Sequence, residues 1–477
     1  MRLKRVLNEM AEEVANWKNY LRSNSMLSSA VKILNKITSR GYTAYIVGGA
    51  VRDIVLGLAP HDIDIATNCP IDEIETIYKT HDIGKSKDFG IVVVQEGGHS
   101  FEVAQYRSDG KYKNGRRPEE IKIEGSFMAD ASRRDFTLNA MGLDKDGNII
   151  DYFDGQKDIK DKVIKTVGDP RKRFGEDYLR LMRTARFSAK LGFKIDPETQ
   201  KAAKELAPNV AKLSPERIRD EIIKAASQSG DKFADYILDL DRLGILEIIL
   251  PEIVKQKEFT HFIEHHPEGK YVWDHTIAAL RVNNIADPLV NLSILLHDVG
   301  KPTTATVRAH GGMAYFGHAE EGMKIVDDIA KRLKMSNDEK ETLIFAVGNH
   351  MKFHLILGMK PSKIAKLVSD KNWDCLVAVA KADNFSRGKN FDYHDDYDKI
   401  VEKAIEIKEK WGAKTMEKVV KLVDGNHVMS LTGLKPSKAV GTIIKSVTDY
   451  IIDYNIDPSN QKAIDELIMK SFEQMNK

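Results

Sequence analysis

Short apolar runs rich in β-branched and aromatic residues mark the chain from about Tyr42 onward. They lie at 44–47, 63–66, 91–95 and 101–106. Stretches with helical spacing separate some of these runs, which is the pattern of a mixed sheet with helices packed against it. Residues 41–165 are therefore predicted to form a mixed α/β head.

The remaining chain carries apolar positions at helical intervals. Leu3, Val6 and Leu7 begin this spacing, so residues 1–40 are predicted to be a helical extension. Beyond about Val167 the spacing is helical almost throughout. The predicted fold class is α+β, with a sheet-containing head followed by an all-α remainder.

Composition excludes several classes of protein. Hydrophobic residues make up 42% and charged residues 30%, which is ordinary for a globular protein and excludes wholesale disorder. No apolar run approaches the ~18 residues needed to cross a bilayer, so no membrane partner is expected, and the N-terminal segment lacks the apolar core of a signal peptide. Two cysteines, Cys69 and Cys375, cannot form a disulfide framework, which favours a reducing compartment and a cytoplasmic location.

The net charge and the distribution of charge along the chain favour different conclusions about a nucleic-acid partner. The formal net charge of +2 over 477 residues gives no support for a nucleic-acid partner. Within residues 165–194, however, nine basic side chains accompany only three acidic ones. Eleven of the 14 histidines lie between His261 and His427. A basic stretch and a separate histidine-rich helical region predict two different chemistries.

The first candidate site begins with a pair of glycines. Gly48 and Gly49 follow a predicted strand and precede a predicted helix that carries Arg52. Glycines let the backbone approach a phosphate closely, and a helix N-terminus supplies free N–H groups. Arg52 adds a forked donor. Taken alone, the glycine pair fits a tight strand–helix turn equally well.

Two carboxylates follow at alternate positions, Asp62 and Asp64. On a short strand they would point to the same face, while Ile63 would face the core. A cation relieves the repulsion within such a pair, and oxygen ligands favour Mg²⁺. Glu102 could join them from a neighbouring strand, and three carboxylates can hold two metal ions. Taken alone, the Asp-x-Asp pattern is also typical of a solvated strand face or turn.

A further polar cluster contains Arg133, Arg134, Asp135 and Asn139. Arginine suits the oxygens of a triphosphate, and Asp or Asn suits ribose hydroxyls. By itself this cluster is also typical of a capped helix start with solvated charges. Farther along, Phe187 falls at helical spacing and is predicted to belong to the core.

Together these segments resemble the class II nucleotidyltransferase family, which includes CCA-adding tRNA nucleotidyltransferases and bacterial poly(A) polymerases. The resembling motifs are Gly48-Gly49-x-x-Arg52-Asp53, Asp62-x-Asp64, Glu102-Val103, Arg133-Arg134-Asp135-Phe136-Thr137, Val167-Gly168-Asp169-Pro170 and Arg173-Phe174-x-Glu176-Asp177-x-x-Arg180. They occur in the family's order between about Tyr42 and Gly230. The resemblance implies a polymerase β-like head followed by an all-α neck and body.

The candidate site residues follow from these motifs. The resemblance implies that Asp62 and Asp64 bind Mg²⁺ and act in catalysis with Glu102. The candidate nucleotide-binding residues are Gly48, Gly49, Arg52, Arg133, Arg134, Asp135, Asn139, Asp177, Arg180, Arg183 and Arg186. The resemblance implies that Asp177 and Arg180 read the base of CTP or ATP. These two are predicted to share one helix face, which taken alone is also typical of solvated ion pairs.

A second set of ligand-type residues lies in the histidine-rich region. It consists of His275, His297, Asp298, His318, His350 and Asp383. The set resembles the HD phosphohydrolase superfamily, whose ligand order is His, His-Asp, then Asp, and the two extra histidines match variants that hold two metals. Imidazoles with carboxylates suit Mn²⁺, Fe, Ni²⁺ or Co²⁺, and open positions would activate a water. A metal-bound structural remnant is the alternative.

The remaining histidines of this region are given no metal-binding role. Loop or surface positions are predicted for His265, His266, His310 and His354.

The resemblance also bears on which enzyme this is. Residues 81–90 and 425–436 resemble CCA-adding members, so the chain is expected to add CCA to tRNA 3′ ends from CTP and ATP, with an HD phosphohydrolase activity. The alternatives are a poly(A) polymerase, a partial enzyme adding only CC or only A, or a phosphohydrolase whose head binds nucleotide or RNA. The oligomeric state is not indicated. The predicted domains are an extension at 1–40, a catalytic head at 41–165, a neck and body at 166–265, an HD domain at 266–390 and a helical tail at 391–477.

Overall fold

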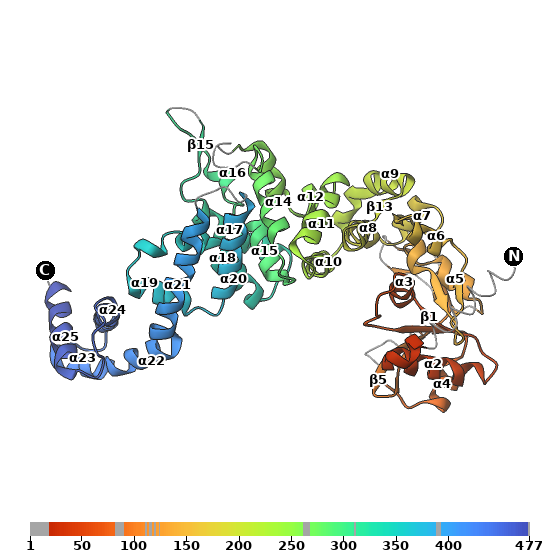
Figure 1. Ribbon diagram of the computed structural model, residues 1–477, viewed down its shortest axis with the longest axis horizontal. Coiled ribbons are helices and arrows are strands. Elements are labelled where there is room, and N and C mark those ends of the chain that lie inside the picture. The colour runs from red at the N-terminus through yellow and green to blue at the C-terminus, as the bar shows by residue number, and fades with distance from the viewer. Residues whose placement is uncertain are drawn as a thin grey trace. The chain divides into compact units, whose positions relative to one another are not determined.

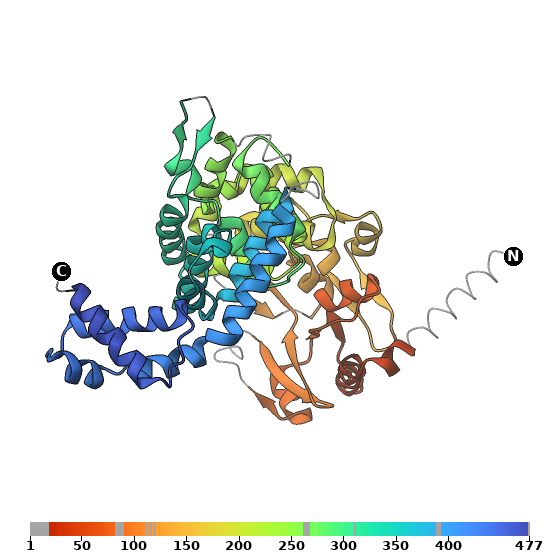
Figure 2. The same ribbon diagram turned by 60° about the vertical axis from the view of Figure 1, so that its left-hand side comes forward.

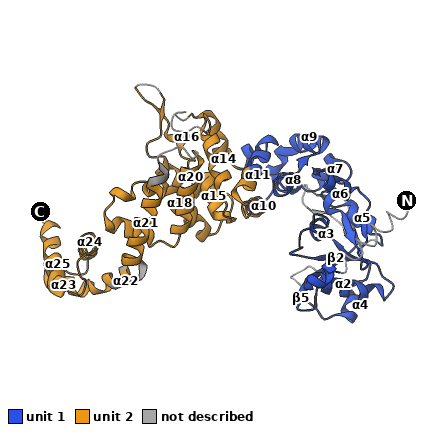
Figure 3. Cartoon of the chain, in the orientation of Figure 1, with its two compact units in different colours: residues 1–221, 235–249 blue, residues 222–234, 250–477 orange. Residues whose placement is uncertain are grey.

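The computed structural model divides the chain into two compact units (Figures 1 and 3). Unit 1 comprises residues 1–221 and 235–249, and unit 2 comprises residues 222–234 and 250–477. The structure describes residues 19–81, 90–109, 112–113, 117–118, 121–123, 125–260, 268–309, 312–387 and 393–475. The predicted helical start at Leu3–Leu7, the segment 82–89, and His265, His266 and His310 lie outside these ranges.

A mixed sheet forms the centre of unit 1. Among the described residues it has seven strands, in the order β11 (Ile149–Asp151), β10 (Met141–Leu143), β1 (Ala44–Val47), β2 (Asp64–Thr67), β5 (His99–Gln105), β4 (Ile91–Glu96) and β3 (Thr80–His81). The pair β2–β5 is parallel and the other neighbours are antiparallel. Short strand pairs join β6 (Arg107–Asp109) to β9 (Ile121–Ile123) and β7 (Tyr112–Lys113) to β8 (Arg117–Pro118).

Helix α2 (Ser25–Thr38) packs against this sheet. Its N-terminus is capped by the Asn24 side chain, which accepts a hydrogen bond from the Leu27 backbone N–H at 2.9 Å. The buried stripe of α2 joins the core formed by strand residues such as Ile46, Ile65 and Val103. It consists of Leu27, Ala30, Ile33, Leu34 and Ile37. The second half of the sequence-predicted extension is therefore part of the head's hydrophobic core.

Shorter helices complete the head, and a helical neck follows it. The head contains α3 (Gly49–Val55), α4 (Ile71–Ile77), α5 (Phe127–Ser132), η2 (Thr137–Asn139) and α6 (Gly155–Lys160). The neck contains α7 (Pro170–Glu176), α8 (Leu179–Leu191), α9 (Pro197–Leu206), η3 (Ala207–Lys212), α10 (Pro215–Ala226), α11 (Gly230–Arg242) and α12 (Leu246–Ile249), with β12 (Val163–Ile164) parallel to β13 (Lys194–Ile195). Asp169 caps α7, Pro170 begins it, and Gly192 ends α8 in the left-handed region.

Unit 2 is helical apart from one small hairpin in the described residues. Its metal-ligand region is built from α14 (Val272–Val282), α15 (Pro288–Leu296), α17 (His318–Arg332), α18 (Asn337–Phe353) and α20 (Trp373–Ser386), which contact one another. The connections include α13 (Pro251–Val254), η4 (Lys255–Glu258), α16 (Lys301–Thr304), β14 (Thr306–Val307), β15 (Met313–Ala314), η6 (Ile356–Gly358) and α19 (Pro361–Val368). The predicted α+β class, a sheet-containing head followed by helices, is confirmed.

The C-terminal part of unit 2 continues the helical architecture. It contains α21 (Tyr393–Trp411), α22 (Ala413–Leu422), α23 (Gly425–Thr432), α24 (Lys438–Asp453) and α25 (Gln461–Met475). The last three helices pack on one another, as Figure 2 shows at the end of the chain. None of the helices in the described ranges is long and apolar enough to cross a membrane.

Candidate functional sites

The glycine turn between β1 and α3 has a backbone that only glycine adopts without strain. Gly48 has φ +73°, and a Cβ at this position would lie 3.0 Å from Nη1 of Arg134. Gly49 begins α3, whose next turn carries Arg52. The turn therefore places backbone without side chains next to the guanidinium groups of Arg52 and Arg134.

Asp64, beside this turn, is coupled electrostatically to two other carboxylates, Asp62 and Glu102. The described side chains do not bring these three into one group close enough to bind a single ion. Asp64 begins β2, opposite Val47, and Glu102 lies on the adjacent parallel strand β5. Burial, then the charges of Asp62 and Glu102, raise the pKa of Asp64 to about 6, while Arg134 opposes this rise. A carboxylate whose charge is opposed by two others is a group that a bound cation would stabilise.

One detail of the predicted strand is wrong. Asp62 was placed on the strand beside Asp64, but β2 begins only at Asp64, where pairing with β1 starts. Asp62 lies in the preceding turn. The buried side chains of Ile63 and Ile65 on either side of Asp64 agree with the predicted alternation.

A pocket rich in arginine lies next to the carboxylates in unit 1. It is lined by Gly48, Gly49, Arg52, Asp64, Arg133, Arg134, Asp135, Asn139, Asp177, Leu179, Arg180, Arg183, Arg186, Phe187, Lys190 and Arg217. All eleven candidate nucleotide-binding residues are in this set, whereas the carboxylates of Asp62 and Glu102 are not. A concentration of guanidinium groups around one cavity suits a polyanionic ligand such as a triphosphate.

The predicted base-reading pair has a different backbone from the one expected. Asp177 is extended and precedes α8, which begins at Leu179, so the pair does not share one helix. The Asp177 carboxylate accepts a hydrogen bond from the Leu179 N–H at 3.1 Å, which fixes it at the helix start. Arg180 donates to Glu176 at 2.7 Å and to the carbonyl of Arg133 at 2.8 Å. Both residues still line the same pocket.

Arg217 is a pocket residue that the sequence analysis missed. Its Nη2 lies 2.8 Å and 3.0 Å from the two carboxylate oxygens of Asp177. It comes from α10, forty positions along the chain, so helical spacing around Asp177 gives no signal for it. The sequence signal for Arg217 is its position at the N-terminal end of a predicted helix, just after Ser214-Pro215.

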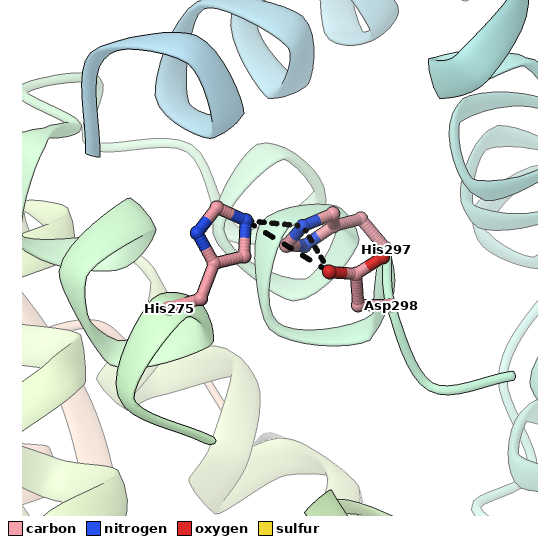
Figure 4. A group of neighbouring side chains, drawn as sticks. All are labelled: His275, His297 and Asp298. Carbon is pink, nitrogen blue, oxygen red and sulfur yellow. Dashed lines mark hydrogen bonds and ion pairs between the residues drawn. The ribbon is translucent and has the colours of Figure 1, made fainter. Parts of the chain in front are cut away.

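Six ligand-type side chains converge inside unit 2. His275, His297 and Asp298 point toward one another (Figure 4), and their ligand atoms could bind one metal ion. The carboxylate of Asp298, with His318 and His350, forms a second such group. Asp298 belongs to both groups, and its two oxygens divide between them.

Distances define this shared arrangement. Oδ2 of Asp298 lies 3.2 Å from Nε2 of His297, and Oδ1 lies 3.5 Å from Nε2 of His318. His275 Nε2 is 3.0 Å from Oδ1 of Asp383, which adds a second carboxylate to the first group. All six side chains are buried. The structure therefore brings together all six residues that the sequence predicted as metal ligands.

The other nitrogen of three imidazoles is bonded to main chain. Nδ1 of His297, His318 and His350 each lies 2.7 Å from the carbonyl oxygen three residues earlier. An Nδ1–H that donates to a carbonyl leaves the Nε2 lone pair free to bind a metal. Burial, then repulsion from His297, lowers the pKa of His350 to about 3, which keeps it a neutral ligand.

Two neighbours of this cluster were not predicted from the sequence, and a third was placed in a loop or on the surface. That third residue, His354, lies in the turn after α18 with its side chain partly exposed, and its Nε2 is 3.2 Å from Oδ2 of Asp383. Arg387 donates to Oδ1 of Asp383 at 3.0 Å. Glu268 lies 2.6 Å from Nδ1 of His275 and orients that ring, as second-layer carboxylates do at metal sites.

Comparison with known protein families matches three segments of the chain. The poly A polymerase head domain matches residues 44–165, and the probable RNA and SrmB-binding site of polymerase A matches residues 192–256. The HD domain matches residues 273–388. The chain therefore carries a poly A polymerase head domain and an HD domain. Both kinds of domain imply dependence on divalent metal ions.

Curated relatives match less than half of this chain. A CCA-adding enzyme of Leuconostoc mesenteroides is 45% identical over 196 residues, which cover 41% of this chain and 48% of that protein. A CCA-adding enzyme of Levilactobacillus brevis is 41% identical over 229 residues, covering 44% and 57%. The matched part thus spans about half the length of these relatives.

Solved structures extend the similarity in fold to most of the chain. The CCA-adding enzyme of Bacillus stearothermophilus in complex with CTP has a TM-score of 0.70 at 22% identity, covering 94% of this chain and 98% of that one. A CCA-adding enzyme of Thermotoga maritima complexed with tRNA has a TM-score of 0.54 at 16% identity, covering 94% and 95%. At these identities the comparison shows a shared fold.

Proposed function

We propose that this protein adds C, C and A to the 3′ end of tRNA from CTP and ATP without a nucleic-acid template. The observation that carries this proposal is the arginine-rich pocket that also contains Asp64, whose charge is coupled to those of Asp62 and Glu102, in a chain that matches CCA-adding enzymes over part of its length. We assign catalysis to residues 41–165, base selection and RNA binding to residues 166–265, and a cytoplasmic location.

In the proposed reaction a tRNA 3′ hydroxyl attacks the α-phosphate of the nucleotide and pyrophosphate leaves. Mg²⁺ held by Asp62 and Asp64, with Glu102 beside them, would activate the hydroxyl and stabilise the leaving group. Gly49, with the forks of Arg52 and Arg134, holds the triphosphate.

The base is read by Asp177, which precedes α8, and by Arg180, in the first turn of α8. The carboxylate of Asp177 accepts from the base and the guanidinium of Arg180 donates to it, which together match a Watson–Crick edge. A growing 3′ end that reshapes the pocket would account for the change from C to A.

The test is a set of incubations with tRNA that lacks its 3′ CCA. The purified protein is supplied with Mg²⁺ and CTP, ATP or both, and the products are sequenced. A stop after CCA supports the proposal. Long A tails support the alternative of a poly(A) polymerase, and products ending in CC or gaining only A support a partial enzyme.

Arg180→Ala is expected to blur the choice of base. Loss of a charged hydrogen-bond donor costs about 1.5–3 kcal/mol, so discrimination between CTP and UTP falls about 10- to 100-fold. The ratio of kcat/KM values for the two nucleotides measures it. Arg242→Ala, which removes an arginine outside the pocket, is the control. A clean CCA product from the Arg180 variant would contradict the base-reading role.

Arg217→Ala is expected to have a related effect through Asp177. Removing Arg217 frees the Asp177 carboxylate from its double contact, so KM for CTP and ATP rises about tenfold with a smaller change in kcat. Steady-state kinetics with each nucleotide measures this. Arg219→Ala is the matched control on α10, because that arginine bonds Asp220 instead. Unchanged KM values in the Arg217 variant would remove it from the site.

A second activity is supported by the buried cluster in unit 2. We propose that the HD domain hydrolyses phosphoesters with one or two ions of Mn²⁺, Fe, Ni²⁺ or Co²⁺. The mixed imidazole and carboxylate ligands suit these metals better than Mg²⁺. The alternative, a metal-bound structural remnant, predicts bound metal without turnover of a phosphodiester.

A further inference from the structure

A guanidinium group lies beside the metal-ligand cluster of unit 2 without belonging to the ligand set. Nη2 of Arg387 donates to Oδ1 of Asp383 at 3.0 Å. The same oxygen lies 3.0 Å from Nε2 of His275, the nitrogen that also faces His297 (Figure 4). A single carboxylate oxygen therefore separates the guanidinium of Arg387 from a ligand nitrogen of the cluster.

The end of helix α20 fixes this position. Asp383 and Arg387 are four residues apart, so their side chains lie on the same face of the helix end. The helix ends at Ser386, and Arg387 is its C-terminal cap. The side chain of Arg387 is 19% exposed, whereas that of Asp383 is 5% exposed. The guanidinium is thus partly accessible, while the carboxylate to which it donates is buried.

The protein uses little of the hydrogen-bonding capacity of this guanidinium. An arginine side chain carries five N–H donors in a planar fork. Within the part of the chain that the structure describes, the Arg387 side chain hydrogen-bonds to Asp383 alone, and its buried Nε has no partner. Asp383, in contrast, has a further neighbour, because its Oδ2 lies 3.2 Å from Nε2 of His354. Since buried donors are almost always paired in native structures, the fork of Arg387 is open to another acceptor.

The charges of the cluster favour an anion as this acceptor. Burial opposes the charge of Arg387, but Asp383 and then Asp298 raise its pKa. Asp298, Asp383 and Glu268 carry three negative charges here, whereas Arg387 and Lys301, which lies 2.6 Å from Oδ2 of Asp298, carry two positive ones. Two divalent metal ions would turn this negative excess into a positive one, so the loaded site attracts anions. A metal ion on Asp383 also weakens the attraction of Arg387 to that carboxylate, because the two cations repel.

We infer that Arg387 binds a non-bridging oxygen of the substrate's phosphate group at the HD site. This deepens the proposed phosphohydrolase function, on which it rests. A phosphate with one oxygen on a metal ion presents its remaining oxygens to the fork, and charge-assisted bonds between arginine and phosphate are short and strong. Arg387 therefore sets the affinity for the phosphate. An arginine that served only to hold Asp383 would set the affinity for the metal instead.

Inorganic phosphate is the probe, because it carries the group that all phosphoester substrates share. Calorimetry with phosphate is carried out on the full-length, Ni²⁺-loaded wild type, Arg387→Met and Arg387→Lys. Arg387→Met keeps the length of the apolar stem and removes the fork, so its phosphate affinity is expected to fall about 10- to 100-fold. Its nickel content, measured by elemental analysis, should equal that of the wild type. Arg387→Lys keeps the charge without the fork and is expected to recover part of the affinity.

Two controls isolate the contribution of the HD site. Asp298→Asn removes the carboxylate common to both metal groups, so it gives the background of phosphate bound by the arginine-rich pocket of unit 1. Arg332→Met removes an arginine that is bonded to Glu252, at the opposite end of α17 from His318, and should leave phosphate affinity unchanged. Inhibition of bis(p-nitrophenyl) phosphate hydrolysis by inorganic phosphate is a second readout, and it should weaken in Arg387→Met by the same factor as the calorimetric affinity.

Two results would overturn the inference. The first is an Arg387→Met variant that binds both nickel and phosphate as the wild type does. The second is a variant that loses nickel in proportion to phosphate, because Arg387 would then act by holding Asp383. If Arg387→Met does not fold, Arg387→Gln, which retains donors without the charge, decides by the same two measurements.

The outcome for the proposed function is read separately. A wild type that binds phosphate at the HD site but hydrolyses no phosphoester contradicts the proposed phosphohydrolase. The comparison of phosphate affinities then still decides the role of Arg387. A wild type that binds no phosphate beyond the background of the Asp298→Asn variant overturns both.

Discussion

Asp64→Ala is expected to abolish nucleotide incorporation while the HD domain continues to hydrolyse phosphodiesters. Burial, and then the charges of Asp62 and Glu102, raise the pKa of Asp64 to about 6. A metal ion bound to these carboxylates loses a ligand when Asp64 is removed. Incorporation should fall about 10²- to 10³-fold or more, because loss of a single charge-stabilising donor costs about that much in other enzymes.

Two assays on one preparation check this expectation. The first measures CMP and AMP incorporation into tRNA lacking CCA. The second measures hydrolysis of bis(p-nitrophenyl) phosphate with Mn²⁺ or Ni²⁺. Asp146→Ala, which removes an exposed carboxylate between β10 and β11, serves as control and should retain both activities. Equal loss of both activities in the Asp64 variant would refute the assignment of two separate sites.

Asp298→Asn is expected to have the reverse effect. Each oxygen of Asp298 faces a different histidine group, so one substitution weakens both metal positions at once. An amide is also a poorer ligand than a carboxylate for these ions. Phosphodiester hydrolysis should fall on the order of 10³-fold and bound metal should decrease, while CCA addition is unchanged.

Elemental analysis and the same two assays measure this result. Asp327→Asn, a partly exposed carboxylate of α17 bonded to Lys331, is the matched control. Thermal unfolding of both variants without added metal separates loss of metal from loss of fold. A variant that retains its full metal content and hydrolysis would show that Asp298 is not a ligand.

The sequence predicted best what depends on residue type at short spacing. The Gly48–Gly49 turn was predicted from position, because a strand followed by two glycines and a helix has few conformations. The resemblance to the HD superfamily indicated the six candidate ligands by their order, and burial then requires these polar side chains to find partners. The glycine turn is local in the sequence, whereas the six candidate ligands extend from His275 to Asp383.

Contacts between distant elements were not predictable in this way. Arg217 reaches Asp177 from α10, and Glu268 reaches His275 from the preceding loop. No spacing rule connects such positions, because tertiary packing brings them together. The helix predicted to carry both Asp177 and Arg180 is also wrong at its start, since Asp177 is extended and its carboxylate accepts the Leu179 N–H where α8 begins.

The helix α2 gives the head a larger folding unit than its family match indicates. The poly A polymerase head domain matches from residue 44, yet Leu27, Ile33 and Leu34 lie fully buried in the same core. Truncating one such side chain to alanine costs about 2–5 kcal/mol, a large fraction of the stability of many domains. Helix α2 and the sheet share one hydrophobic core, so the strands that carry Asp64 and Glu102 are supported by residues that precede the matched domain.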